Sequence, residues 1–201
     1  MLEFMTNEIN LSTEDKQYFK EGRLDKINGW DTFKRENLQD YKKVCNSIKN
    51  GFLKSIYPGY NVLVNPILFK KTDFCSPAIC IGNETSNGVI VLNDEDQIMF
   101  NPKVVIEVVY SSLDGALAHK LNFYEKLGIK EYEIINISDR QVISFELGNN
   151  GLYQLVDIDN LSKGRLVSFP TKCGNLTVDM GVLYRITNLT DSKVFKKTNL
   201  F

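Results

Sequence analysis

Residues 103–137 decide the fold, and they read KVVIEVVYSSLDGALAHKLNFYEKLGIKEYEIINI. Residues 103–110 form a nearly unbroken β-branched run, which is typical of a strand buried on both faces. Residues 111–127 have the pattern of a helix, with two serines at its start and a glycine directly after its end. Residues 129–137 are the next β-rich run. A strand, a helix and a strand in this order predict two parallel strands joined by a right-handed crossover.

The flanking sequence extends this unit to one α/β domain that spans residues 1–201. No internal repeat, low-complexity tract or linker argues for a second domain. Apolar residues recur at helical spacing before the unit, and short β-rich runs lie on both sides of it. The expected parts, in order, are N-terminal helices within 12–56 (at 12–22 and 37–56), a β meander and central strand over 60–110 (with runs at 60–69, 76–82 and 88–92), the helix and parallel strand of 111–137, C-terminal β-hairpins within 140–185, and a tail at 190–201.

The overall composition is that of an ordinary globular protein. Hydrophobic residues make up 43% and charged residues 24% of the 201 residues, which excludes a disordered or fibrous chain. Twenty-four basic against 25 acidic residues give a net charge of −1. A protein that holds nucleic acid by bulk charge alone is strongly basic, so binding of nucleic acid would need a local basic patch.

Cysteine use and the N-terminus both indicate a cytoplasmic protein. The four cysteines are too few and too scattered for a disulfide framework, and each lies among apolar residues. The first residues lack the basic start and apolar centre of a signal peptide, and no apolar run reaches the roughly 18 residues that a membrane span needs. We therefore expect a reducing compartment and no membrane.

One carboxylate breaks the apolar pattern of the strand 103–110. Strand alternation places Glu107 on the same face as Lys103, among valines, and a lone buried carboxylate costs several kcal/mol without a partner. At about 100° per residue, Lys120 falls in the middle of the helix stripe that faces the sheet, whereas His119 lies on the opposite side. We therefore expect Lys120 and Glu107 to approach each other.

This expected pair has two interpretations. One is a buried ion pair whose lysine stem reaches toward the sheet edge. The other is half of a metal-dependent phosphodiesterase site, in which acidic side chains hold Mg²⁺ against the scissile phosphate and a lysine orients the attacking water. Such a site normally needs two or more acids, and these residues alone supply one.

The same stretch resembles the signature of the Uma-type restriction endonucleases, in the PD-(D/E)XK nuclease superfamily. The residues that fall at the family's spacing are Glu107 followed by Val108, then Ser111, Lys120, Tyr124, Gly128 and the pair Glu131-Tyr132. The flanking helices, the meander and the late hairpins also fit. The resemblance covers most of residues 12–183, and it is specific over 102–136.

The resemblance implies a fold, a reaction and partners. The fold is a restriction-endonuclease-like mixed β-sheet flanked by helices, with additional β-hairpins. The activity is Mg²⁺-dependent cleavage of double-stranded DNA by a homodimer. In this chain Glu107 would be the metal ligand, Lys120 would assist catalysis, and Ser111 and Tyr124 would support them.

The chain departs from the family pattern at the acidic positions. The family usually has Pro-Asp on an earlier strand, where this sequence has Pro77-Ala78, and again before the glutamate strand, where it has Pro102-Lys103. A further family aspartate, four residues before the helix lysine, is replaced by Ala116. The resemblance therefore predicts weakened or lost catalysis and leaves Mg²⁺ binding open, with an inactive DNA- or protein-binding module as the alternative.

Two acids lie near the replaced positions. Asp73, five residues before Ala78, is a candidate if a strand shift or a loop brings it near Glu107. Asp114 is two residues before Ala116, and two residues rotate a helical side chain by about 200°, toward the opposite face. Asp114 is thus better interpreted as part of the helix cap with Ser111.

Overall fold

The structure is a computed structural model, and it describes residues 38–70, 73–93, 96–109, 115–136, 139–160 and 166–179. The chain divides into two compact units, residues 1–38 and 39–201, and the described residues after Leu38 all belong to the second. The expected helix at 12–22 and the tail at 190–201 lie outside the described residues. Within the described part, no helix is long and apolar enough to cross a membrane.

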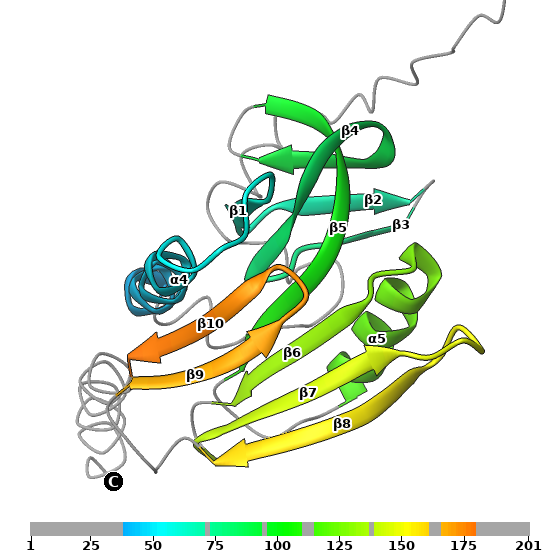
Figure 1. Cartoon of the computed structure of the whole chain (residues 1–201). Helices are drawn as coiled ribbons and strands as arrows, with labels where there is room; N and C mark the ends of the chain where they lie inside the picture. Colours follow the sequence, from blue (N-terminus) through cyan, green and yellow to red (C-terminus); the bar gives the residue numbers. More distant parts are fainter. Residues whose placement is uncertain are drawn as a thin grey trace, which may run out of the picture. The chain divides into compact units, whose positions relative to one another are not determined.

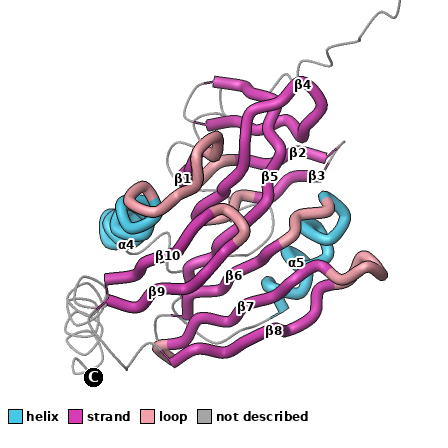
Figure 2. Tube along the Cα trace, viewed as in Figure 1, coloured by secondary structure: helices cyan, strands magenta, loops and turns pink. Residues whose placement is uncertain are grey.

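An eight-stranded mixed sheet dominates the second unit, which confirms the expected fold class (Figures 1 and 2). The strand order is β3-β2-β4-β5-β6-β7-β8, and β1 pairs with β4 beside this path. The strands are β1 (Asn61–Val64), β2 (Ile67–Lys70), β3 (Asp73–Cys75), β4 (Ile79–Asn93), β5 (Asp96–Val109), β6 (Glu131–Asn136), β7 (Gln141–Leu147) and β8 (Tyr153–Asn160).

The predicted strand–helix–strand unit is confirmed. Strands β5 and β6 pair in parallel and are connected through helix α5 (Gly115–Leu127). The helix ends where the sequence predicts, because Gly128 has φ 72° and the Ile129 amide donates to the Tyr124 carbonyl at 3.2 Å. A left-handed glycine with this backward hydrogen bond is the usual way to satisfy the last carbonyls of a helix.

The meander differs from the expected runs at two places. The single run expected at 60–69 is two strands, because Asn65 adopts a left-handed conformation with φ 50° between β1 and β2. Conversely, the two runs expected at 76–82 and 88–92 belong to the one strand β4, which continues across a bulge. Glu84 and Val89 both pair with Phe100, so the four residues between them loop out without ending the strand.

A second, two-stranded sheet and a helix complete the unit. Helix α4 (Leu38–Phe52) ends four residues before the expected end at residue 56. The hairpin of β9 (Leu166–Thr171) and β10 (Gly174–Asp179) contacts the end of this helix. A Cβ atom on Gly51 would lie only 2.0 Å from the Thr177 carbonyl oxygen, so glycine permits this close approach.

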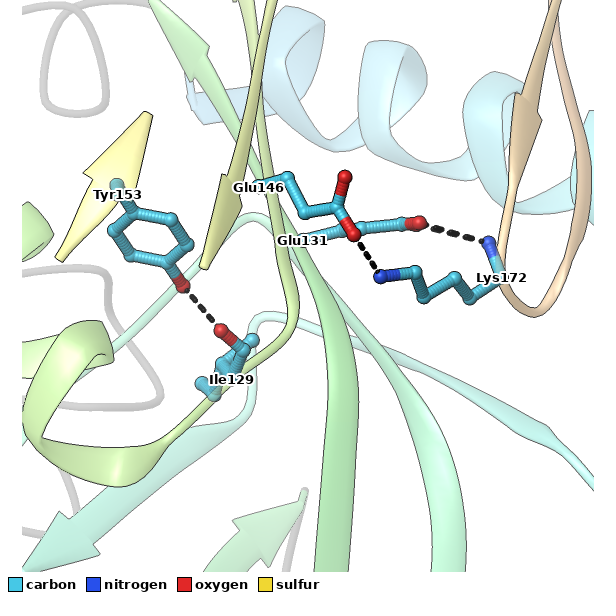
Figure 3. Close-up of polar contacts among 5 residues, drawn as sticks. All are labelled: Ile129, Glu131, Glu146, Tyr153 and Lys172. Carbon is cyan, nitrogen blue, oxygen red and sulfur yellow. Dashed lines mark hydrogen bonds and ion pairs between the residues drawn. The ribbon is translucent and has the colours of Figure 1, made fainter. Parts of the chain in front are cut away.

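The turn of the β9–β10 hairpin is fixed to the main sheet by Lys172. Its amide donates to the Glu131 carboxylate at 2.9 Å and its ammonium group pairs with Glu146 (Figure 3). Glu131 and Glu146 are register partners on β6 and β7. The next residue of β6, Tyr132, packs against Tyr124 of α5, so the hairpin and α5 lie on opposite faces of the sheet.

Candidate active site

Glu107 is positioned near the end of β5, between β4 and β6. The residue is 1% exposed, and its neighbours on the strand, Ile106 and Val108, are buried as well. It faces α5, on the same side of the sheet as Tyr132 and Ile134. A carboxylate in the middle of an apolar strand must therefore be compensated from within the protein.

Helix α5 supplies that compensation from two consecutive turns. The Lys120 ammonium donates to Oε2 of Glu107 at 2.7 Å, and the Tyr124 hydroxyl donates to Oε1 at 2.6 Å. These two residues are four positions apart and so lie on one face of the helix. The predicted approach of Lys120 to Glu107 is confirmed. Both carboxylate oxygens accept a hydrogen bond from the helix.

Two further residues, Cys75 and Tyr132, extend this network; sequence reasoning did not place Cys75 at the site and named Tyr132 only as part of the resemblance. The Cys75 thiol, from β3, donates to the Tyr124 hydroxyl at 3.3 Å. The ring of Tyr132 lies edge-on to that of Tyr124, and its buried hydroxyl has no hydrogen-bond partner among the described residues. Burial, together with nearby Cys75 and Glu107, raises the pKa of Tyr124 well above its usual value, and burial does the same to the pKa of Tyr132. Both phenols therefore stay protonated at neutral pH.

The position of the first replaced aspartate lies beside Glu107. In the β4–β5 register Ile79 pairs with Ile106 and Cys80 with Val105. The pairing ends there, and Ala78 is the residue directly before β4, as Glu107 is the residue directly after Ile106. Ala78 is fully buried. The position at which the resemblance expects an aspartate is therefore a buried methyl group, close in register to the strand residue before Glu107.

The described side chains do not fit a Mg²⁺ ion. Among the described residues no group of three or more potential ligands gathers at one point. Glu107 is the single carboxylate of the network, and its oxygens already accept bonds from Lys120 and Tyr124. Mg²⁺ favours several oxygen ligands with carboxylates among them. Asp73 starts β3, two residues before Cys75, but its side chain is outside the described ones.

The expected placement of Lys103 on the same face as Glu107 is wrong. Gly82 pairs with Pro102 and Ile81 with Val104, so Lys103 is an extra residue in a β-bulge and the alternation counted from Glu107 breaks there. Lys103 instead contributes a positive charge near Cys173, in the turn of the β9–β10 hairpin. Ser111 and Asp114, and the side chains of Ala116 and His119, are outside the described part of the chain.

A second buried carboxylate lies on the other face of the sheet. Glu133 of β6 is 5% exposed and accepts a hydrogen bond from the Ser144 hydroxyl. Burial raises the pKa of Glu133 to about 8, the Ser144 bond opposes this, and Glu131 and Asp157 add to the rise. The alternation argument that found Glu107 would have found Glu133 too, because it also interrupts a β-rich run.

Comparison with known proteins supplies a family. The Uma2 family model, described as "Putative restriction endonuclease", matches residues 60–179, which is more than half of the chain and includes Glu107 and Lys120. No curated protein matches the sequence. A solved structure of "a putative nuclease belonging to DUF820" from Anabaena variabilis is similar, with 12% identity and a TM-score of 0.46 over 73% of this chain and 81% of that chain.

Proposed function

The chain belongs to the Uma2 family of restriction-endonuclease-like proteins, and from this premise we propose a cytoplasmic, DNA-binding nuclease fold whose Mg²⁺-dependent cleavage is weakened or lost. One observation carries the loss of cleavage. Ala78 is fully buried and directly precedes Ile79, the partner of Ile106, so we infer that a methyl group stands where the family has its second carboxylate. The four cysteines, all buried free thiols, support a reducing compartment.

The contacts of Lys120 support the same proposal. In metal-dependent hydrolysis, a lysine beside the site is useful when it can orient water or offset charge that develops on the phosphate. Here the ammonium group is 2.7 Å from Glu107 and its side chain is 12% exposed. Its charge is therefore used to neutralise a buried carboxylate, which is a structural task.

We propose supporting roles at the site for three further residues. Tyr124 orients Glu107 through its 2.6 Å hydrogen bond. Ser111, four residues before the described start of α5 at Gly115, is proposed as a supporting residue from the resemblance alone. Asp73, five residues before Ala78 in the sequence, is the acid that we propose as a candidate second carboxylate.

The test is cleavage of supercoiled plasmid DNA with Mg²⁺ or Mn²⁺ in excess. We expect the wild-type protein to cleave no faster than Glu107→Gln, which keeps the size of the side chain and removes its charge. Thermal unfolding of both proteins serves as the folding control. Robust cleavage by the wild-type protein that is abolished in Glu107→Gln and in Lys120→Ala would overturn the proposal and indicate that Asp73 or another acid completes the site.

A homodimer is the second part of the proposal, and strand β8 is its candidate interface. This strand ends the sheet, and Leu155, Val156 and Ile158 are 55%, 61% and 50% exposed. Exposed apolar side chains on a sheet edge are typical of subunit contacts. The molar mass from light scattering should be that of a dimer, and Leu155→Lys/Ile158→Lys should give a monomer.

The control for this variant uses the other face of the same strand. Leu155 and Ile158 pair with Phe145 and Ile143, whereas Gln154 pairs with Glu146 on the opposite face. Gln154→Lys should therefore leave the dimer intact. A wild-type protein that is monomeric at high concentration would contradict the dimer.

A further inference from the structure

Positive charge is concentrated in one part of this nearly neutral chain. Between Asp40 and Asp73 the sequence contains no acidic residue, but it contains six lysines. Four of them, Lys42, Lys43, Lys49 and Lys54, lie in helix α4 or in the turn directly after it. Because the whole chain has a net charge of −1, the remainder is correspondingly acidic. A local basic surface is thus set against an acidic background.

The geometry of α4 brings these lysines together on its outer side. One side of the helix is buried, through Val44, Cys45, Ile48 and Phe52. At about 100° per residue, Asn46 and Asn50 lie at the centre of the opposite, outer side of the helix. Two lysines lie on each flank of these asparagines. Lys42, Lys43, Lys54 and both asparagines are exposed, and Lys49 is half-buried. We call this set the α4 lysine face.

No carboxylate among the described side chains neutralises most of this face. The structure gives no ion pair or side-chain hydrogen bond to Lys42, Lys49 or Lys54 within the described residues. Elsewhere in the described part, lysines such as Lys120 and Lys172 are paired with glutamates. Uncompensated lysines in a row attract anions, and with asparagine donors between them they favour an extended polyanion.

We propose that the α4 lysine face binds the phosphate backbone of double-stranded DNA. The last helical hydrogen bond, from the Leu53 amide to the Lys49 carbonyl at 2.9 Å, closes the helix at Phe52, and Lys54 lies in the turn that follows. Lys42 and Lys49 are separated by about 10 Å along the axis, at about 1.5 Å per residue, and Lys54 lies beyond them. Duplex DNA carries one charge per about 1.7 Å of its axis, so lysines at this spacing reach several phosphates.

The choice of DNA as the polyanion rests on the proposed function. The α4 lysine face itself does not include the candidate active site. Helix α4 contacts the β9–β10 hairpin, on the sheet face opposite α5 and Glu107. Binding by the lysine face is therefore expected to be independent of the carboxylate.

The experiment compares two charge-matched double variants. A fluorescent DNA duplex of arbitrary sequence is titrated with protein, and anisotropy gives the affinity at several salt concentrations. Lys42→Gln/Lys54→Gln removes two charges from the lysine face, and Lys126→Gln/Lys130→Gln removes two exposed charges outside it. Each phosphate contact adds about 0.9 to the slope of log affinity against log salt. We expect the first variant to reduce this slope by about 2 and the affinity at low salt by about 10-fold or more, and the second to change neither.

The outcomes separate this inference from the proposed function. If the wild-type protein binds the duplex and both double variants weaken binding equally, the total charge of the protein accounts for binding. The proposed role of the α4 lysine face is then refuted, while the proposed function stands. If Lys42→Gln/Lys54→Gln binds like the wild-type protein, the DNA surface lies elsewhere. If the wild-type protein binds no duplex but binds vesicles of anionic phospholipid, both the inference and the DNA-binding function fail. Circular dichroism confirms that each variant is folded, and the glutamines preserve helix propensity.

Discussion

Replacing Ala78 with aspartate tests the central claim about the candidate active site. Ala78 is fully buried and directly precedes Ile79, the partner of Ile106, and if this register continues, its Cβ atom lies about 5 Å from that of Glu107. The Lys120 and Tyr124 donors are already bonded to Glu107. The new carboxylate would therefore be buried without a partner, beside a like charge. We expect Ala78→Asp to lose about 3–5 kcal/mol of unfolding free energy when divalent ions are chelated.

Divalent ions should then recover part of that loss, because the two carboxylates can share a cation. Binding to the folded state alone adds about 2.7 kcal/mol when the ion is at 100 times its Kd. For a protein of this size 1 kcal/mol shifts the Tm by roughly 2–4 °C. The Tm of Ala78→Asp should thus rise by about 5–10 °C from EDTA to excess Mn²⁺, as followed by circular dichroism, while that of the wild-type protein changes little.

The matched control is Ala78→Asn, which has the same shape without the charge. It should be destabilised as well, but Mn²⁺ should not restore it. If Mn²⁺ raises the Tm of the wild-type protein as much as that of Ala78→Asp, the site already has a second acid and the reasoning from Ala78 is refuted. If Mn²⁺ leaves Ala78→Asp unchanged, the two carboxylates cannot share an ion and Ala78 is not the missing ligand position.

Three further predictions concern stability. Glu133 has a pKa of about 8 in the folded protein, against an ordinary value of 4.5. Between these two pH values the folded state keeps a proton that the unfolded state has lost. The free energy of unfolding therefore falls by up to about 5 kcal/mol as the pH rises from 4.5 to 8. Glu133→Gln should flatten this dependence in urea unfolding followed across pH, and an unchanged slope would contradict the raised pKa. Tyr124→Phe should cost about 1.5–3 kcal/mol, because its hydroxyl bonds a carboxylate, whereas Tyr132→Phe should be neutral or stabilising, because its hydroxyl has no partner. Equal losses in urea unfolding would mean that the Tyr132 hydroxyl is bonded after all. Gly128→Ala should lower the unfolding free energy by about 1 kcal/mol, since alanine is strained at φ 72°, and an unchanged Tm would argue against this cap.

Local periodicity accounts for what the sequence predicted correctly. The strand β5, the helix stripe with Lys120 and the stop at Gly128 are each read within a few residues, and the crossover rule then joins β5 to β6. The pairing of Glu107 with Lys120 followed from two such local patterns. Regular alternation among residues that are neighbours in sequence is therefore sufficient to predict the Glu107–Lys120 pair.

The rest depends on contacts that no local pattern contains. Cys75 reaches Tyr124 across 49 positions of sequence, through the placement of β3 at the far edge of the sheet. The face of Lys103 depends on a register shift against β4, which alternation within β5 alone cannot reveal. The bend at Asn65 requires a left-handed backbone, which asparagine tolerates but does not dictate.

The pair of Lys120 and Glu107 also bears on how a nuclease fold can drift over evolutionary time. In a buried site with two acids and one lysine, losing one aspartate leaves one negative and one positive group, and these compensate each other. On the proposal that Ala78 replaces an aspartate, the 2.7 Å contact is the state that such a loss leaves, with Tyr124 satisfying the second oxygen. The reverse substitution, from alanine to aspartate, introduces an unpaired buried charge. Losing the aspartate therefore costs less stability than regaining it.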